Sequence, residues 1–150
     1  MDDQNQSTLD VLLIEDNEGD VLLTQETMNE INSPVNLHIA KDGEKALSRM
    51  MKEGEFQDAE TPDLILLDLN IPKVNGFDIL KKAKSTPSLK HIPIIVLSTS
   101  NKDKDVLDSY QQYVNCYITK PVDLEEFATI IYNIEQFWFR TVKLPTTIYK

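Results

Sequence analysis

Three short runs of consecutive apolar residues constrain the fold of this chain more than any other feature. Val11–Ile14, Leu64–Leu67 and Ile92–Leu97 are apolar throughout, rather than at alternate positions. Strands of this kind are buried on both faces, as in a parallel sheet that helices cover on either side. Two weaker runs, Leu37–Ala40 and Val114–Ile118, bring the number of expected strands to five.

Segments with helical spacing separate and follow the expected strands. Their apolar residues recur three or four positions apart, and side chains that can cap free helix amides precede them. The expected caps are Asp16 or Asn17, Asp42, Asn101 and Asp123. Five strand–helix units predict an α/β fold, with one doubly wound, five-stranded parallel sheet in a single domain.

Length and charge limit the organisation of the chain and the partners it can have. The 150 residues fit one domain, which we place at residues 9–139, after a disordered start (1–8) and before a tail (140–150). A formal net charge of −10 repels phosphate backbones and anionic lipids, so we expect neither nucleic acid nor membrane as a partner. The acidic start is unlike a signal peptide and no apolar stretch approaches ~18 residues, which indicates a cytoplasmic protein.

The glycine, cysteine and histidine residues exclude several kinds of site. The four glycines stand too far apart for a Rossmann or P-loop phosphate cradle. Cys116 is the only cysteine, so the chain has neither an internal disulfide nor a cysteine-built zinc site. His38 and His91 belong to no zinc-binding motif.

Charged and hydroxyl side chains stand where the expected strands end. Glu15 and Asp16 follow the first strand, Asp68 the third, Ser98 ends the fourth, and Lys120 comes just after the fifth. Ligands of a doubly wound sheet bind outside the carboxyl ends of its strands, so these side chains should meet there. Crowded carboxylates need a cation, and their oxygens favour Mg²⁺. Such a site suits phosphoryl transfer to Asp68, with Lys120 neutralising charge and Ser98 donating a hydrogen bond.

Together these motifs resemble the receiver domain of two-component response regulators, over about residues 9–139. The residues that carry the resemblance are Glu15-Asp16, Asp68-Leu69-Asn70-Ile71-Pro72 with Gly76 after it, Ser98, and Tyr117 to Lys120-Pro121. The resemblance implies a flavodoxin-like (βα)5 fold. It also implies a signalling switch rather than an enzyme, in which Asp68 accepts a phosphoryl group from the histidine of a sensor kinase.

The resemblance further implies a metal site that supports phosphorylation and dephosphorylation of the chain by its own chemistry. Asp16 would bind Mg²⁺ or Mn²⁺ directly, and Glu15 would bind it directly or through water. Asp68 and the backbone carbonyl of Asn70 would complete the protein ligands. The side chains of Asn70 and Ser100 would flank the path of an attacking water molecule.

A conformational switch is the third implication of the resemblance. Lys120 would bridge Asp68 and the phosphoryl group, next to a cis Lys120–Pro121 bond. Ser98 would move towards a phosphoryl oxygen, and Tyr117 would change between outward and inward rotamers in response. Phosphorylation would then shift the population between two states of the domain.

The last expected helix is more apolar than packing against one sheet requires. Its expected core stripe consists of Leu124, Phe127, Ile131, Ile134 and Trp138. Further apolar side chains lie beside the stripe, at Ile130, Tyr132, Phe137 and Phe139. An exposed apolar surplus is typical of a protein interface, so we expect these four residues to form a homodimer contact, with the tail as a possible arm. The alternative is that residues 141–150 fold back over the helix.

Four further segments resemble the cyanobacterial phytochrome-associated response regulators, the Rcp type. They are residues 53–62, residues 114–117, the pair Phe137-Trp138 and residues 141–145. This narrower resemblance implies a phytochrome-like kinase as the partner and a homodimer formed through the last strand and helix. Because the sequence ends at Lys150, we expect a receiver without an output domain, acting through an unknown downstream protein or phosphotransfer partner.

Two other functions remain open on the sequence. An Mg²⁺-dependent phosphatase could use Asp68 as its nucleophile, but such enzymes usually carry a second aspartate where this chain has Asn70. A receiver-fold scaffold could act without phosphate, but it would not need the acidic, serine and lysine set. Hydrolysis of a small phosphate ester would distinguish the first, and an unchanged phenotype of Asp68→Asn the second.

Overall fold

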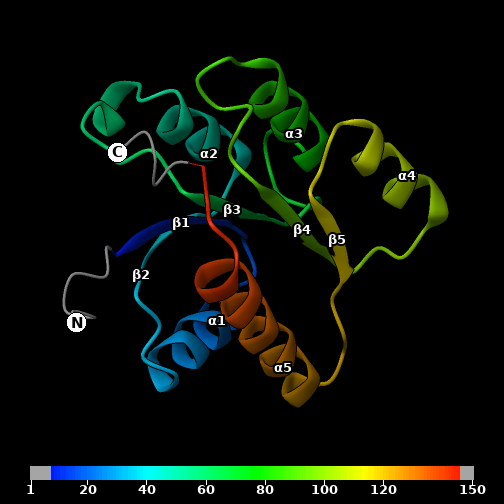
Figure 1. Cartoon of the computed structure of the whole chain (residues 1–150). Helices are drawn as coiled ribbons and strands as arrows, with labels where there is room; N and C mark the ends of the chain where they lie inside the picture. Colours follow the sequence, from blue (N-terminus) through cyan, green and yellow to red (C-terminus); the bar gives the residue numbers. More distant parts are fainter. Residues whose placement is uncertain (1–7, 146–150) are drawn as a thin grey trace.

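A five-stranded parallel sheet organises the chain (Figure 1). The computed structural model describes residues 8–145. The strands are β1 (Leu9–Ile14), β2 (Val35–Ala40), β3 (Leu64–Leu67), β4 (Ile94–Ser98) and β5 (Cys116–Thr119). Their order in the sheet is β2-β1-β3-β4-β5, with every neighbouring pair parallel. The predicted doubly wound fold is therefore confirmed, while nearly all of the expected disordered start lies outside the described residues.

Helices cover both faces of this sheet (Figure 1). They are α1 (Glu18–Glu30), α2 (Gly43–Met50), α3 (Gly76–Ser85), α4 (Asp103–Gln111) and α5 (Leu124–Ile134), with a 3₁₀ turn η2 (Gly54–Phe56) and a π-helical segment η3 (Glu135–Thr141). Helices α1 and α5 lie on one face, and α2, α3 and α4 on the other. Within residues 8–145, no helix has the length and apolar character needed to cross a bilayer.

The sheet separates two hydrophobic cores. Successive residues of a strand point to opposite faces, so β1 supplies Leu12 and Ile14 to one core and Val11 and Leu13 to the other. All six residues of β1 are buried, as are all residues of β3 and β4. This two-sided burial is the physical reason for the uninterrupted apolar runs.

Most of the helix caps predicted from the sequence are confirmed. Asn17 and Asp42 accept hydrogen bonds from amides of the first turns of α1 and α2, and Asp123 does so for α5. The prediction that Asn101 caps a helix is wrong. Helix α4 begins one residue later, after Lys102, whose side chain makes no capping hydrogen bond. The side chain of Asp105, in the first turn of α4, accepts a hydrogen bond from the Ser100 hydroxyl at 2.5 Å.

A change of helical pitch at the end of α5 alters which residues face the sheet. In a π-helix the hydrogen bonds span five residues instead of four. Ile134 is buried, and Phe139, five residues later, is the next residue buried in the same core, whereas Trp138 is only half-buried. The placement of Phe139 at an exposed interface is therefore wrong. The prediction that Leu124 is a core residue is also wrong. Leu124 is the first residue of α5, ahead of the first residue of the helix that reaches the core, and it is 68% exposed.

Part of the tail returns to the core beside α5. Leu144 is only 2% exposed within this core, and Val142 packs against it. The backbone N–H of Val142 donates to the carbonyl of Phe137 at 2.9 Å. Fold-back is thus observed for this part of the tail, which was the alternative to an extended arm. Residues 146–150 of the expected arm lie outside the described residues.

We predict that Gly76→Ala destabilises the domain. A Cβ atom at this position would lie 2.5 Å from the Cα atom of Leu69 and 3.0 Å from the carbonyl oxygen of Asp68, so the loop after β3 would have to shift. We expect a loss of about 1–3 kcal/mol in the free energy of unfolding, measured by urea denaturation. Lys81→Ala, an exposed substitution on the same helix, should stay within about 0.5 kcal/mol of the parent. Equal stability of the two variants would contradict this close packing.

Candidate functional site

The carboxyl ends of four strands bring the predicted reactive side chains together. Glu15 follows β1 and Asp68 follows β3, the two strands between which the order of the sheet reverses. Ser98 is the last residue of β4, and Lys120 follows β5. All four residues are buried. The order of the strands therefore places side chains that are far apart in the sequence in one small region.

Lys120 is the centre of this site. Its Nζ donates to Oδ2 of Asp68 at 3.1 Å, to Oδ2 of Asp20 at 2.9 Å, and to Oε1 of Glu15. Its backbone N–H donates to the carbonyl of Ser98 at 2.7 Å. The expected cis Lys120–Pro121 bond is wrong, because residues 8–145 contain no cis peptide bond. The ammonium reaches all three carboxylates with this bond trans.

Asp20 is a site residue that the sequence reasoning missed. It lies in the first turn of α1, where its backbone N–H donates to the Asn17 side chain at 3.0 Å while its carboxylate contacts Lys120 at 2.9 Å. Acidic residues are common in the first turn of a helix, where they oppose the helix dipole. Its position in the sequence could have predicted this role. Asp20 lies in the first turn of the helix that directly follows β1, so it stays near the carboxyl ends of the strands.

Three carboxylates are arranged so that they could hold a metal ion. Glu15, Asp16 and Asp68 each offer one oxygen atom, and these atoms lie within 4.8 Å of one another. Asp16 is exposed, while the other two are buried, so the cluster is open on one side. Hard oxygen ligands with an open side fit Mg²⁺, which usually keeps several of its waters. Asn70 lies two residues after Asp68 in the sequence, and its backbone N–H donates to Oδ1 of Asp68 at 3.0 Å.

The charges of the site are unbalanced. Burial raises the pKa of Glu15 to about 7; the hydrogen bond from Lys120 opposes this shift, and the Asp68 carboxylate adds to it. Burial alone would lower the pKa of Lys120, but its bonds to Glu15 and Asp20 outweigh burial and raise that pKa. Lys120 is therefore a stable cation among an excess of carboxylates, and a divalent cation would relieve their mutual repulsion.

Ser98 and Tyr117, the expected switch residues, are connected through Ser100. The Tyr117 hydroxyl donates to the backbone carbonyl of Ser100 at 2.7 Å, and the Ser100 N–H donates to Oγ of Ser98 at 3.3 Å. The Tyr117 ring packs against the core beneath α2 and α3, and burial raises the pKa of its hydroxyl. The hydroxyl of the Ser100 side chain donates to Oδ2 of Asp105 at 2.5 Å.

The expected interface residues of the last helix have different environments. Phe137 is 53% and Tyr132 45% exposed, while Ile130 is half-buried. Ile130 and Phe137 line an apolar groove of about 180 Å³, whose other lining residues include Ile118 of β5 and Trp138. Only Phe139 of the four expected residues is buried in the core.

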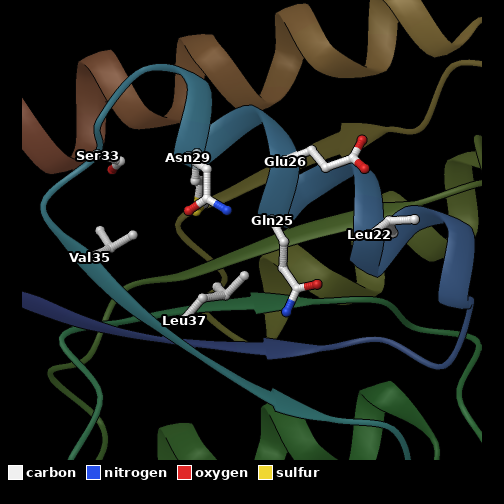
Figure 2. A pocket seen from close by; sticks show the side chains of 8 residues that line it. Leu22, Gln25, Glu26, Asn29, Ser33, Val35 and Leu37 are labelled. Carbon is white, nitrogen blue, oxygen red and sulfur yellow. The ribbon is translucent and has the colours of Figure 1, made fainter.

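A larger cavity of about 380 Å³ lies between α1 and the edge strand β2 (Figure 2). Gln25, Glu26 and Asn29 extend from α1, and Val35 and Leu37 belong to β2. None of its lining residues belongs to the acidic cluster. The strand ends, rather than this cavity, therefore carry the reactive groups.

Known proteins are similar to this chain in sequence and in fold. Residues 11–132 match the response regulator receiver domain. Response regulator Rcp1 of Synechocystis is 40% identical over 145 residues, which cover 97% of this chain and 99% of Rcp1. The crystal structure of phosphorylated RcpA, a cyanobacterial phytochrome response regulator, has a TM-score of 0.90 at 43% identity, covering 93% of this chain and 99% of RcpA. The Mn²⁺-bound form of Rcp1 has a TM-score of 0.89 at 41% identity, covering 91% and 99%. The family match and the near full-length similarity show that this chain belongs to the response regulator receiver family.

Proposed function

We propose that this chain is a response regulator that accepts a phosphoryl group on Asp68 from a sensor histidine kinase. The observation that carries the proposal is the contact of 3.1 Å between Nζ of Lys120 and Oδ2 of Asp68 beside the acidic cluster. In the reaction, an Asp68 oxygen bonds to phosphorus as the bond from phosphorus to the histidine nitrogen breaks. The products are an acyl phosphate on Asp68 and the unmodified histidine of the kinase, which is the leaving group.

The contacts of Asp68 prepare it for this reaction. One oxygen accepts from the N–H of Asn70 and the other from Lys120, so the carboxylate is held in one orientation. Positioning and charge neutralisation are the main contributions a protein makes to phosphoryl transfer. Lys120 supplies a positive charge for the phosphoryl oxygens, and Ser98 supplies a hydroxyl donor.

Mg²⁺ or Mn²⁺ is the proposed cofactor. Glu15, Asp16 and Asp68 would hold it, with the Asn70 carbonyl as a further ligand, and the open side of the cluster would admit the phosphoryl group. The bound ion would neutralise part of the charge on the phosphoryl oxygens. The Mn²⁺-bound form of Rcp1, a relative that aligns over nearly the whole chain, supports this proposal.

A phytochrome-like histidine kinase is the proposed phosphodonor. Both Rcp1 and the phytochrome response regulator RcpA align with nearly the whole chain at 40% identity or more. The proposed output is a change in contact with a downstream protein or phosphotransfer partner. The scaffold and phosphatase alternatives gain no support from the site, which pairs Asp68 with Lys120 and has Asn70 where a second aspartate would stand.

We also propose a homodimer that uses the exposed apolar side chains of the last helix. Phe137, Tyr132 and Ile130 remain candidates, since Phe139 is buried within the chain. The groove beside Phe137 offers an apolar surface that a second copy could cover across a twofold axis.

We predict that incubation with acetyl phosphate and Mg²⁺ adds one phosphoryl group to the wild-type chain. Intact-mass analysis should find the adduct in the wild type and neither in Asp68→Asn nor without Mg²⁺, because the amide cannot form an acyl phosphate. An adduct on Asp68→Asn would assign phosphorylation to another residue. If both acetyl phosphate and a phosphorylated phytochrome-like kinase failed to modify the wild type, the scaffold alternative would be favoured.

We predict that Mg²⁺ stabilises the wild-type fold through the acidic cluster. Saturation to about 100 times the dissociation constant should add about 2.7 kcal/mol to the free energy of unfolding, measured with and without the ion. Asp16→Asn should lose most of this gain, because one ligand is removed. Glu18→Gln is the matched control. It also removes one negative charge, but from an exposed side chain two residues after Asp16 that does not belong to the acidic cluster. Equal responses of both variants would indicate general charge screening instead.

We predict that Phe137→Asp converts the dimer to a monomer in analytical ultracentrifugation. A carboxylate buried in an apolar contact lacks a compensating partner and weakens association. Glu126→Gln, an exposed change on the same helix, should leave the sedimenting mass unchanged, and both variants should still bind Mg²⁺. A wild type that sediments as a monomer would contradict the proposed interface.

A further inference from the structure

Side chains in the π-helical segment η3 make contacts across five residues. Nε of Arg140 donates to both carboxylate oxygens of Glu135. The hydroxyl of Thr141 donates to the backbone carbonyl of Gln136 at 2.9 Å. On an α-helix, side chains three or four positions apart are neighbours, while residues five positions apart lie about 140° apart around the axis. These contacts therefore belong to the wider turn of a π-helix.

Glu135 brings a buried charge into this segment. Its side chain has no exposed surface, and its two oxygens lie 2.8 and 2.9 Å from Nε of Arg140. Oε1 also accepts from the carboxamide of Gln136 at 2.8 Å. Arg140 is the only basic residue of the segment, so no other cation within η3 can pair with this carboxylate. A buried carboxylate that loses its cation is strongly destabilising.

The apolar pattern of the same helix fits a different spacing. Phe127, Ile131 and Ile134 are buried at α-helical intervals. The next position of this stripe is Trp138, four residues after Ile134. In the observed register Trp138 is only half-buried, and Phe139 lies in the core instead. Two aromatic residues therefore compete for one place in the core, and the helical register decides between them.

The register also determines the aromatic surface that the helix presents. The rings of Phe137 and Trp138 meet edge to face, with their centres 5.5 Å apart. Both residues line the groove of about 180 Å³ that also includes Ile118 and Ile130. If Trp138 turned into the core, the groove would lose one of its walls.

We propose that the Glu135–Arg140 ion pair selects the π-helical register, and that both residues are positioning residues for the aromatic groove. A buried ion pair can fix one of two registers even where apolar residues would be as stable. An α-helical register would carry Arg140 around the helix and away from Glu135, which would leave the buried carboxylate unpaired. The consequence for self-association rests on the proposed homodimer, whereas the choice of register does not.

The first test uses the fluorescence of Trp138, the only tryptophan of the chain. The double variant Glu135→Met/Arg140→Met removes both charges and keeps side chains of similar length. Its emission should shift to shorter wavelength and acrylamide should quench it less, because Trp138 enters the core as Phe139 leaves it. The spectra are recorded at a concentration where sedimentation shows only monomer, so a second copy does not contribute.

The matched control removes an ion pair that is exposed and has α-helical spacing. Lys104→Met/Asp108→Met does this on α4 and should leave the Trp138 emission unchanged. An unchanged emission in the Glu135/Arg140 double variant would overturn the proposal. A double variant that fails to fold would overturn it as well, because the pair would then be needed for folding rather than for the choice of register.

Two single variants separate the choice of register from a general loss of stability. Arg140→Lys keeps a cation and should retain the emission of the wild type. Arg140→Met leaves Glu135 unpaired and should unfold at a lower urea concentration than the double variant, because the double variant has no buried charge. Equal emission in Arg140→Lys and in the double variant would contradict the role of the ion pair.

The second test measures the sedimenting mass at a concentration where the wild type associates. The Glu135→Met/Arg140→Met variant should sediment as a monomer, and the Lys104→Met/Asp108→Met control should match the wild type. A dimeric double variant with shifted Trp138 emission would overturn the link between register and groove. A wild type that stays monomeric contradicts the proposed homodimer instead, and the fluorescence comparison then decides the register alone.

Discussion

The ammonium group of Lys120 is almost fully removed from water, and carboxylates from three separate parts of the chain converge on it. Glu15 comes from the end of β1, Asp20 from the first turn of α1, and Asp68 from the end of β3. A buried charge must be paired, so this contact fixes how the ends of β1, β3 and β5 meet. Asp68, the proposed phosphoacceptor, is held by the same lysine, so the stability of the strand ends and the geometry of the proposed reaction have a common origin.

The same cluster is a compromise between stability and function. One ammonium faces more carboxylates than it can neutralise, and burial already raises the pKa of Glu15. Apolar residues would pack at these strand ends without such repulsion, but they could neither hold a divalent cation nor accept a phosphoryl group. The excess of negative charge gives the site its affinity for cations, and the rest of the sheet supplies the stability that tolerates it.

The sequence was sufficient where local patterns and tertiary packing agree. The apolar runs of β1, β3 and β4 predicted a covered parallel sheet, and the position of the strand ends predicted that Glu15, Asp68 and Lys120 would meet. Predictions failed where the spacing of residue types carries no signal for the contact that forms. Phe139 faces the core because a π-helical segment shifts the spacing after Ile134, and Glu135, buried and paired with Arg140 at 2.8 Å, lies in that segment. Asp20 and the Ser100–Asp105 contact carried no distinctive spacing, since acidic residues are ordinary in first turns.

The return of the tail to the core determines where this domain physically ends. The family match stops at residue 132, but Ile134, Phe139 and Leu144 belong to the hydrophobic core on the side of the sheet that α1 and α5 cover. A protein cut at the end of the family match would leave the side chains beneath them facing water. Any fusion of another protein behind this domain must therefore join the chain after Leu144, so that the segment closing the core remains part of the folded unit.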